Sequence, residues 1–324
     1  MKPVTESLDV SNSTAWPSGA VATPTTVLRV ERSDSIPSVA AVRSRPVRRR
    51  WRALTVSNVL VAVSSFVVAA CFVCAAIPDV LAPYAPTAMH TDAILQSPGG
   101  AHLLGTDQFG RDVLSLVIYG ARQSLLIGIF AVSISCSVGV FLGLLAGYAG
   151  GAIDMVIMRF IDIWMAIPSI LLAIALSTAL GPSLHTTIFA VSVATVPRYA
   201  RVLRGQALAI RGRAFIQAAR VSGSSHASIL LRHVLPHCLA PALVMATLGV
   251  GLSILLGAGL SFLGLGVNDE RPDWGYLLTQ GRGYLTVAWW TVTFPGLAIT
   301  ALVISVNLLG DALRKRSDPR RAQH

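Results

Sequence analysis

Long apolar stretches constrain this chain more than any other feature of its sequence. A helix that crosses the hydrocarbon core of a bilayer needs about 20 mainly apolar residues. Six stretches reach or approach that length, of which the fourth is the shortest: residues 54–77, 125–148, 156–180, 184–200, 241–264 and 287–309. Several contain proline or glycine, which membrane helices tolerate when neighbouring helices cover the exposed backbone. The pattern predicts an all-α, polytopic membrane protein with six transmembrane helices.

Charged residues are scarce and unevenly placed. They make up 13% of the chain, whereas a soluble domain carries about 25%, and no acidic residue occurs between Asp162 and Asp269. The net charge of +11 comes from arginines that flank the apolar stretches and that do not form a basic face with aromatic platforms. We therefore expect membrane lipid, and no nucleic acid, around the basic residues.

The distribution of lysine and arginine predicts how the chain crosses the membrane. Nine of these residues precede the first apolar stretch, seven lie between Arg198, near the end of the fourth, and the start of the fifth, and five follow the last, whereas the connections after the first and the fifth hold two each. Cytoplasmic connections carry the excess of positive charge. Both termini and the connection at 201–238 are therefore predicted to be cytoplasmic.

Three regions follow from this layout. Residues 1–50 show no sustained periodicity and are predicted to form a disordered cytoplasmic tail. The first apolar stretch begins too far along the chain for a signal peptide, so it is read as a retained span. Residues 51–312 form the membrane domain, which includes the cytoplasmic connection 201–238, and residues 313–324 form a second cytoplasmic tail.

Residues that support catalysis or cofactor binding are sparse. A phosphate-binding P-loop requires a lysine within G-x-x-x-x-G-K-[ST], and the two lysines, Lys2 and Lys315, lack that context. Cys71 and Cys74 lie in one apolar stretch and are read as small helix residues, and no second cysteine pair completes a zinc site. We expect no ATPase activity in this chain, no catalytic residue, no metal, no cofactor and no disulfide.

Coupling to an ion gradient would need ionisable groups deep in the membrane. The apolar stretches contain one acid, Asp162, and one embedded base, Arg159, three residues apart near the cytoplasmic end of the third stretch, shortly before Pro168. This position favours a structural ion pair over a proton relay. An ion-coupled secondary transporter and a non-transporting membrane scaffold stay open as alternatives to a pore that another chain drives.

The connection at 213–236 is polar, amphipathic and interrupted by glycine. Residues 213–222 can form a short helix, in which Phe215 and Ile216 can fill a pocket on a partner. Gly223 can adopt the left-handed conformation that ends a helix. The segment therefore predicts a short helix with a defined end, followed by a turn.

A second helix is predicted after Gly223. Ser224 or Ser225 can cap its start, and it is expected to end before Pro236 and to lead into the fifth apolar stretch. The two helices form a helix–turn–helix elbow (residues 213–236) across the membrane face. From the residues alone two readings stay open: a surface on which a partner acts, or an amphipathic interfacial helix anchored by arginines.

The elbow resembles the EAA loop of ABC-importer permeases, whose pattern is E-A-A-x3-G-x9-I-x-L-P. The matching residues are Gln217, Ala218, Ala219, Gly223, Leu235 and Pro236. Two positions depart from the pattern, because Gln217 stands where the family has Glu and His233 stands where it has Ile. Further blocks match in order at residues 102–125, 158–174, 261–267, 273–285 and 294–320. Within the family the chain is most similar to the DppC/OppC branch of dipeptide and oligopeptide permeases, which also has nickel relatives.

This resemblance covers about residues 50–320 and implies a MetI-like permease fold in a bacterial plasma membrane. It implies a subunit that forms half of the pathway for di- or oligopeptides, nickel or a related small solute, and that works by alternating access. The implied partners are a second (DppB/OppB-like) permease, two ATP-binding subunits or domains, and an extracytoplasmic solute-binding protein. The residues implied to couple to the ATPase are Phe215, Ile216, Gln217, Ala218, Ala219, Arg220, Gly223, Leu235 and Pro236.

A further family motif precedes the second apolar stretch, on the predicted outer side. Its residues are Gly105, Thr106, Asp107, Gly110, Arg111 and Asp112. A calcium loop would place more oxygen ligands at alternate positions, so we favour a turn in which Thr106 or Asp107 caps the helix that follows. Packing against the sister permease or the binding protein is the alternative role.

Overall fold

A computed structural model of the chain describes residues 47–266 and 272–317. The contacts described below lie within the unit Arg50–His324. Most of the predicted N-terminal tail (1–46) and part of the predicted C-terminal tail (318–324) lie outside the described residues. Within the described ranges the regular structure is helical, apart from one bridge that joins Thr106 to Asp112. This agrees with the predicted all-α class.

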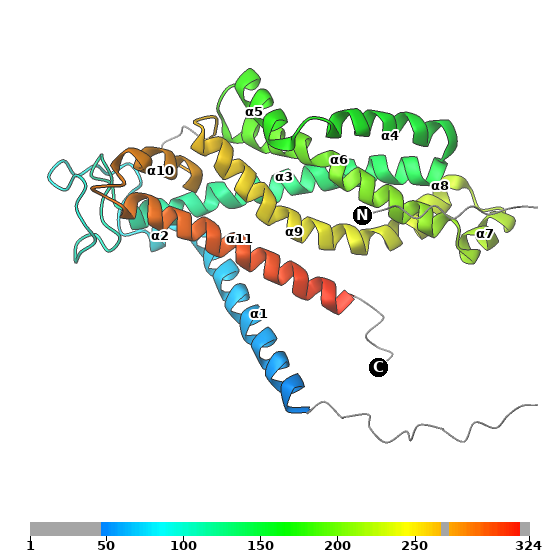
Figure 1. Cartoon of the computed structure of the whole chain (residues 1–324), viewed down its shortest axis with the longest axis horizontal. Helices are drawn as coiled ribbons and strands as arrows, with labels where there is room; N and C mark the ends of the chain where they lie inside the picture. Colours follow the sequence, from blue (N-terminus) through cyan, green and yellow to red (C-terminus); the bar gives the residue numbers. More distant parts are fainter. Residues whose placement is uncertain (1–46, 267–271, 318–324) are drawn as a thin grey trace, which may run out of the picture. The chain divides into compact units, whose positions relative to one another are not determined.

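Six long or medium helices and several short ones follow one another along the chain (Figure 1). The longer helices are α1 (Val47–Ala76), α3 (Val113–Ala149), α4 (Gly151–Met165), α6 (Leu184–Arg211), α9 (Leu235–Phe262) and α11 (Trp290–Ser317). The shorter ones are α2 (Pro78–Leu81), α5 (Ser169–Leu180), α7 (Ala214–Val221), α8 (His226–Ile229) and α10 (Trp274–Gly281). A π-helical turn, Leu230–Val234, precedes α9, and a 3-10 turn, Arg282–Tyr284, follows α10.

Two helices extend past the predicted boundaries of the membrane domain. α1 begins at Val47, so the last four residues of the predicted tail (47–50) are helical, and α11 continues to Ser317, beyond residue 312. No proline or glycine interrupts residues 47–76, so backbone hydrogen bonding continues past the apolar part. The two helices are therefore longer than the apolar stretches within them, because helical hydrogen bonds do not require apolar side chains.

Four helices within the described ranges are long and apolar enough to cross a membrane: Asn58–Ala76, Val113–Ala149, His226–Phe262 and Trp290–Lys315. A fifth span results if α4 and α5, which are bent by 83° at a short break, count as one. The predicted fourth stretch lies in α6, whose second half carries arginines and is less apolar. The number of six spans therefore stays a prediction.

The predicted third stretch, 156–180, consists of two helices. α4 ends at Met165, α5 starts at Ser169, and Pro168 occupies the N-cap position of α5. Proline has no backbone N–H, and its ring disfavours the helical conformation of the residue before it. Pro168 therefore explains a break that the apolar pattern alone does not reveal.

Close backbone contact joins α3 to α6, which run beside each other (Figure 1). Gly139, Gly143 and Gly147 lie on the face of α3 that contacts α6. A Cβ atom on Gly143 would lie 2.5 Å from the Ala200 carbonyl oxygen and 2.9 Å from the Arg204 nitrogen. Small residues allow such an approach, which is how helices associate where lipid supplies no hydrophobic driving force.

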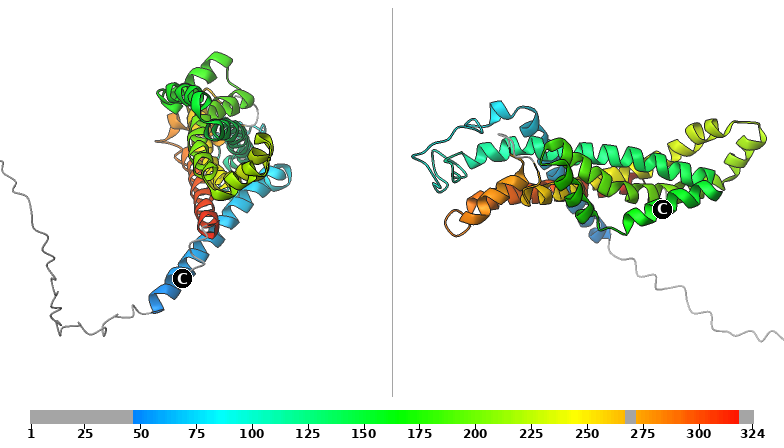
Figure 2. Two further views of the ribbon diagram at one scale, coloured as in Figure 1. Left: turned by 90° about the vertical axis from the view of Figure 1, so that its right-hand side faces the viewer. Right: turned by 90° about the horizontal axis from the view of Figure 1, so that it is seen from above.

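The two ends of the helix bundle differ in what they contain. The connection at 82–112 and α10 lie at one end, the α10 end, and α7 and α8 lie at the other, the α7 end (Figures 1 and 2). At the α7 end, buried residues from α3, α6, α7, α8 and α9 form one apolar cluster. At the α10 end, a second cluster joins α3, α9, α10 and α11, and part of α1 packs against it through Val68, Cys71 and Cys74. The cysteines Cys71, Cys74, Cys136 and Cys238 are free thiols.

The substitution G143A should destabilise the permease, because its methyl group would push α6 away from α3. Overpacking of this kind costs about 1–3 kcal/mol. G205A is the matched control: Gly205 lies in α6, and a Cβ atom there meets no atom within 4 Å, so it should be neutral or slightly stabilising. Thermal unfolding of the two purified variants in detergent checks this. Equal unfolding temperatures would contradict the close α3–α6 contact.

Candidate functional site

The family motif at the α10 end is a buried, hydrogen-bonded loop. All six motif residues are buried. Asp107 Oδ1 accepts hydrogen bonds from the backbone N–H groups of Phe109 and Arg111, each at 2.8 Å. Asp107 Oδ2 accepts from Arg111 Nε at 2.7 Å, and a second guanidinium nitrogen donates to Gln280 Oε1 on α10 at 2.7 Å. The loop is therefore tied both to itself and to α10.

The cap of α3 is Asp112, so the prediction that Thr106 or Asp107 caps this helix is wrong. Asp112 Oδ2 accepts from the Ser115 backbone N–H and hydroxyl, both at 2.8 Å, and Oδ1 lies 3.0 Å from His102 Nδ1. A cap must directly precede the first helical residue, which is Val113. Thr106 instead receives the Gln96 N–H on its hydroxyl at 2.8 Å.

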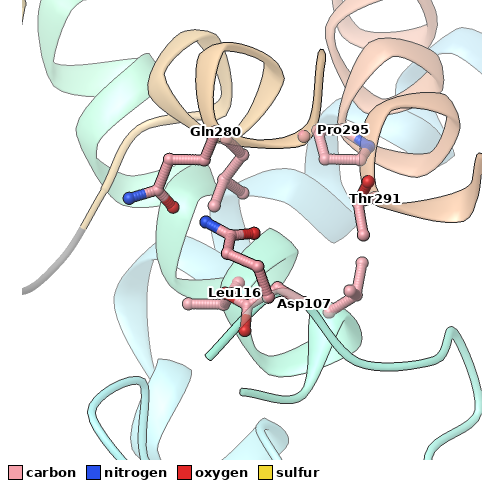
Figure 3. A pocket seen from close by; sticks show the side chains of 9 residues that line it. Asp107, Leu116, Gln280, Thr291 and Pro295 are labelled. Atoms are coloured by element: carbon pink, nitrogen blue, oxygen red, sulfur yellow. The ribbon is translucent and has the colours of Figure 1, made fainter. Parts of the chain in front are cut away.

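A small cavity lies beneath this loop, between the loop, α10 and the start of α11 (Figure 3). Asp107, Gln280, Thr291 and Pro295 line it, and it leaves about 10 Å³ for the centre of a water molecule. The lining residue Gln108 has a buried Oε1 atom without a hydrogen-bond partner in the described structure. A water molecule fits this space and this acceptor, whereas a substrate does not.

No group of three or more His, Cys, Asp or Glu side chains in the described ranges is arranged to hold a metal ion. Both carboxylates of the motif accept hydrogen bonds from neighbouring groups of the chain. The geometry therefore favours a structural role for the loop, which fixes the start of α3 against α10 and α11. Trp290 Nε1 adds a hydrogen bond of 3.0 Å to the Thr106 carbonyl.

A further buried carboxylate lies at the α10 end, and the sequence did not single it out. Asp273 caps α10 by accepting from the Tyr276 N–H at 2.9 Å, and it accepts from the Ser261 hydroxyl of α9 at 2.7 Å. Burial raises the pKa of its carboxyl to about 6, although these hydrogen bonds act in the opposite direction. An aspartate directly before a helix is a common N-cap, so the Asp-Trp-Gly sequence at 273–275 could have indicated Asp273 from the sequence.

The elbow at the α7 end has the predicted first helix and turn. α7 spans Ala214–Val221, and Gly223 has a φ of +81°, in the left-handed region. The Ser224 N–H donates to the Ala219 carbonyl at 3.1 Å and the Gly223 N–H donates to the Arg220 carbonyl at 3.0 Å. These two bonds define a Schellman motif. Ser225, one of the two predicted caps, caps α8.

Ile216 does not fill a pocket on a partner, contrary to the prediction. Its side chain is 0% exposed, and it packs in the apolar cluster of this chain with Ile229 and Val234. Phe215 is 38% exposed and stacks on His237, with 5.3 Å between ring centroids. An eight-residue helix must bury one face against its own protein, and Ile216 lies on that face.

The remaining face of α7 is open. Gln217, Ala218 and Arg220 are exposed, Ala219 is half-buried, and Val221 is 90% exposed. Of the predicted coupling residues, this face holds Phe215, Gln217, Ala218 and Arg220. Ile216 lies on the opposite face and packs in the apolar cluster of the chain. The surface is small, neutral to basic and flanked by apolar atoms.

The second helix of the elbow does not end before Pro236, as the sequence predicted. α8 passes through the π-helical turn Leu230–Val234 directly into α9, where Pro236 is among the first residues. A proline removes one helical hydrogen bond and crowds the carbonyl four residues earlier. The wider π turn just before it accommodates that crowding. Leu235 is half-buried on the apolar cluster and Pro236 is exposed.

The predicted ion pair between Arg159 and Asp162 is absent. Asp162 pairs with Arg201 of α6 at 2.5 Å, and Asp154 pairs with Arg204 at 2.5 Å to Nε. Arg159 is exposed and makes no ion pair within the described structure. α6 runs beside α4, so its guanidinium groups reach the acids from the neighbouring helix. The three-residue spacing of Arg201 and Arg204 was the signal in the sequence.

Comparisons with known proteins agree with this geometry. The family described as "Binding-protein-dependent transport system inner membrane component" matches residues 139–323. The dipeptide transport system permease protein DppC of Alkalihalophilus pseudofirmus is 46% identical over 226 residues, which cover 70% of this chain and 74% of that protein. The di/tripeptide transport system permease protein DppC of Pseudomonas aeruginosa is 43% identical over 253 residues, which cover 76% and 84%.

A solved structure of the MetNI methionine ABC transporter in inward-facing conformations has a chain with the same fold. The TM-score is 0.52 at 20% identity, over 63% of this chain and 97% of that chain. The chain therefore belongs to the family of binding-protein-dependent transport system inner membrane components, as a DppC/OppC-like permease of an ABC importer. It is a multi-pass membrane protein that works with other ABC subunits, and the predicted family and all-α permease fold are confirmed.

The substitution D273N should make stability less sensitive to pH. The folded state holds a proton on Asp273 up to about pH 6, whereas the unfolded chain releases it near pH 4. Between these values the folded state binds more protons, so its stability falls as the pH rises. Relative to D273N, the wild type should lose about 1–2 kcal/mol of unfolding free energy between pH 5 and pH 7.5.

Thermal unfolding of both proteins in detergent across this pH range measures the difference. An asparagine can accept the Tyr276 N–H and donate to Ser261, so the cap persists in D273N. Parallel pH profiles for the two proteins would contradict a raised pKa at Asp273.

Proposed function

We propose that this permease forms one half of the translocation pathway of an ATP-driven importer for di- or oligopeptides. The single observation that carries the proposal is the elbow: α7 is anchored by Ile216 and open on its other face, and the chain continues without a break from α8 into the apolar helix α9. A force on the open face of α7 would therefore reach a membrane helix. The names of the relatives, which include dipeptide and di/tripeptide permeases, support small peptides as the substrate.

The proposed partners follow from the family. They are a second, DppB/OppB-like permease, two ATP-binding subunits or domains, and an extracytoplasmic solute-binding protein. The elbow carries three arginines, Arg213, Arg220 and Arg232, and no acid, which supports a cytoplasmic position for the α7 end. The motif loop and α10, at the opposite end of the bundle, would then face the binding protein.

The proposed mechanism is alternating access between two global states. ATP binding closes the ATPase dimer, the closed dimer moves α7, and α7 moves α9 and the end of α6 through their shared apolar cluster. Hydrolysis reverses the movement. Because neither lysine lies in a P-loop, we assign ATP hydrolysis to the partner subunits.

The ion pairs between α4 and α6 favour this mechanism over an ion-coupled carrier. Asp154 and Asp162 are the acids of α4, and each accepts from an arginine of α6. Both carboxylates contact a second helix of this chain, which favours a structural role over that of a proton relay. If the chain were a non-transporting scaffold, the conformation of the elbow would not change when nucleotide binds to a partner.

Reconstitution separates these functions. The permease, its sister permease, the ATPase subunits and the binding protein are placed in vesicles, and uptake of a labelled dipeptide is measured with and without ATP. We expect uptake only with ATP and all subunits. Uptake that persists without the ATPase but responds to a proton gradient would instead indicate a secondary carrier, and no uptake under any condition would indicate a scaffold.

The substitution G223V should uncouple ATP hydrolysis from uptake. Valine is strained at a φ of +81°, so the turn after α7 would shift and the open face would be misplaced. G212V is the matched control, because Gly212 is also exposed near α7 but has a φ of −80°, which valine can adopt. Uptake by G223V should fall by about tenfold or more, with normal membrane insertion. Equal uptake by the two variants would refute the role of this turn.

A further inference from the structure

A basic pocket lies between the elbow and the ends of α3 and α6, and of the residues on the open face of α7 it contains Arg220. We define this inner pocket by its lining residues, which come from the ends of α3, α6 and α7, from α8 and from the π turn: Tyr148, Ala149, Arg211, Arg220, His226, Ala227 and Leu230. Its volume is about 430 Å³. It is therefore large enough for a phosphate group with its substituents, and far larger than the cavity beneath the motif loop.

Contacts among its own residues hold the walls of the pocket. Tyr148 is buried, and its hydroxyl lies 3.0 Å from His226 Nδ1. The Arg220 guanidinium lies 5.7 Å above the centre of the Tyr148 ring, a distance at which a cation is attracted to an aromatic face. Arg220 and His226 thus both contact Tyr148, the first above its ring and the second at its hydroxyl.

The two arginines of the pocket form no ion pair with an acidic side chain among the described residues. Neither Arg211 nor Arg220 makes an ion pair in that part of the chain. Asp154 lies within electrostatic reach of Arg211, but its two oxygens already accept from Arg204 at 2.5 and 2.7 Å. Two guanidinium groups and an imidazole therefore line a common space, and neither guanidinium forms an ion pair among the described residues.

We propose that the inner pocket binds the phosphate group of an anionic phospholipid from the cytoplasmic leaflet. Guanidinium groups bind phosphate oxygens through paired, charge-assisted hydrogen bonds. Basic pockets at the cytoplasmic ends of membrane helices take anionic headgroups, and Leu230 gives this pocket an apolar wall beside its charges. The choice of lipid as the source rests on the cytoplasmic orientation proposed above, whereas the phosphate chemistry follows from the side chains alone.

Occupation of the pocket has a mechanical consequence for the elbow. Arg211 is the last residue of α6 and Arg220 lies in the last turn of α7. A phosphate held by both would bridge the ends of these helices and fix α7 against the bundle. The lipid would thus regulate the movement of the helix that is proposed to contact the ATPase.

The test uses the assembled transporter in detergent and counts bound lipid by native mass spectrometry, with phosphatidylglycerol against phosphatidylcholine. R211Q/R220Q removes both pocket arginines. R213Q/R232Q is the matched control, since it removes two exposed arginines of the elbow that do not line the pocket. R211Q alone is the second variant, because Arg211 lies outside the predicted ATPase-coupling residues.

We expect the wild type and R213Q/R232Q to retain phosphatidylglycerol in preference to phosphatidylcholine. R211Q/R220Q should weaken this retention by about tenfold or more, and R211Q by a smaller factor. A titration with inorganic phosphate distinguishes the source of the group. If phosphate binds with the same dependence on the two arginines while the lipid does not, the phosphate site stands with free phosphate as its ligand.

Two outcomes would overturn the proposal. One is equal lipid and phosphate binding by R211Q/R220Q and R213Q/R232Q. The other is loss of the ATPase subunits from R211Q while the control keeps them, with no difference in lipid or phosphate binding, which would make the pocket part of the ATPase interface. Dipeptide uptake by the wild-type transporter is measured in parallel, because its failure would count against the proposed function and not against the pocket.

Discussion

The approach of α6 to α3 is the contact on which the rest of the structure depends. In lipid, two helices gain little by burying apolar side chains against each other, so their association relies on close packing. The face of α3 that carries Gly139, Gly143 and Gly147 permits that packing. Once α6 lies there, Arg201 and Arg204 reach the acids of α4, and the end of α6 carries α7. The ion pairs and the elbow thus follow from the absence of side chains on one helix face.

The two ends of the bundle use polar residues in opposite ways. At the α10 end, Asp107, Arg111 and Asp112 are buried, and their hydrogen bonds are made within the chain. A buried polar group without a partner costs about 1–3 kcal/mol, so such a network stabilises one fixed arrangement. At the α7 end, Arg211 and Arg220 lack acidic partners in the described structure. These three motif residues at the first end therefore bond within the chain, whereas the second end has arginines outside any ion pair of the described residues, which other molecules can bind.

The sequence predicts local features of this protein well and contacts between helices poorly. The short helix of the elbow, its end at Gly223 and the cap at Ser225 follow from residues that are neighbours in the chain, and each is observed. Whether Ile216 faces a partner or its own protein depends on where α8 and α9 lie, which an eight-residue pattern does not contain. The partner of Asp162 depends in the same way on α6, 39 residues further along the chain. The family motifs identified the protein, but they did not indicate which motif residues are buried.

The π turn between α8 and α9 changes the direction in which the side chains of α9 point around the helix axis, relative to those of α8. Each residue of an α-helix advances the side-chain direction by about 100°, and a π turn contains one residue more than the surrounding pitch accommodates. The side chains of α8 and those of α9 are therefore out of phase, although hydrogen bonding runs from one to the other. Because the helical hydrogen bonding is continuous, a rotation of α8 can be passed to α9 in the same way as a translation. Rotation of α8 about its axis would thus present a different face of α9 to its neighbours in the bilayer.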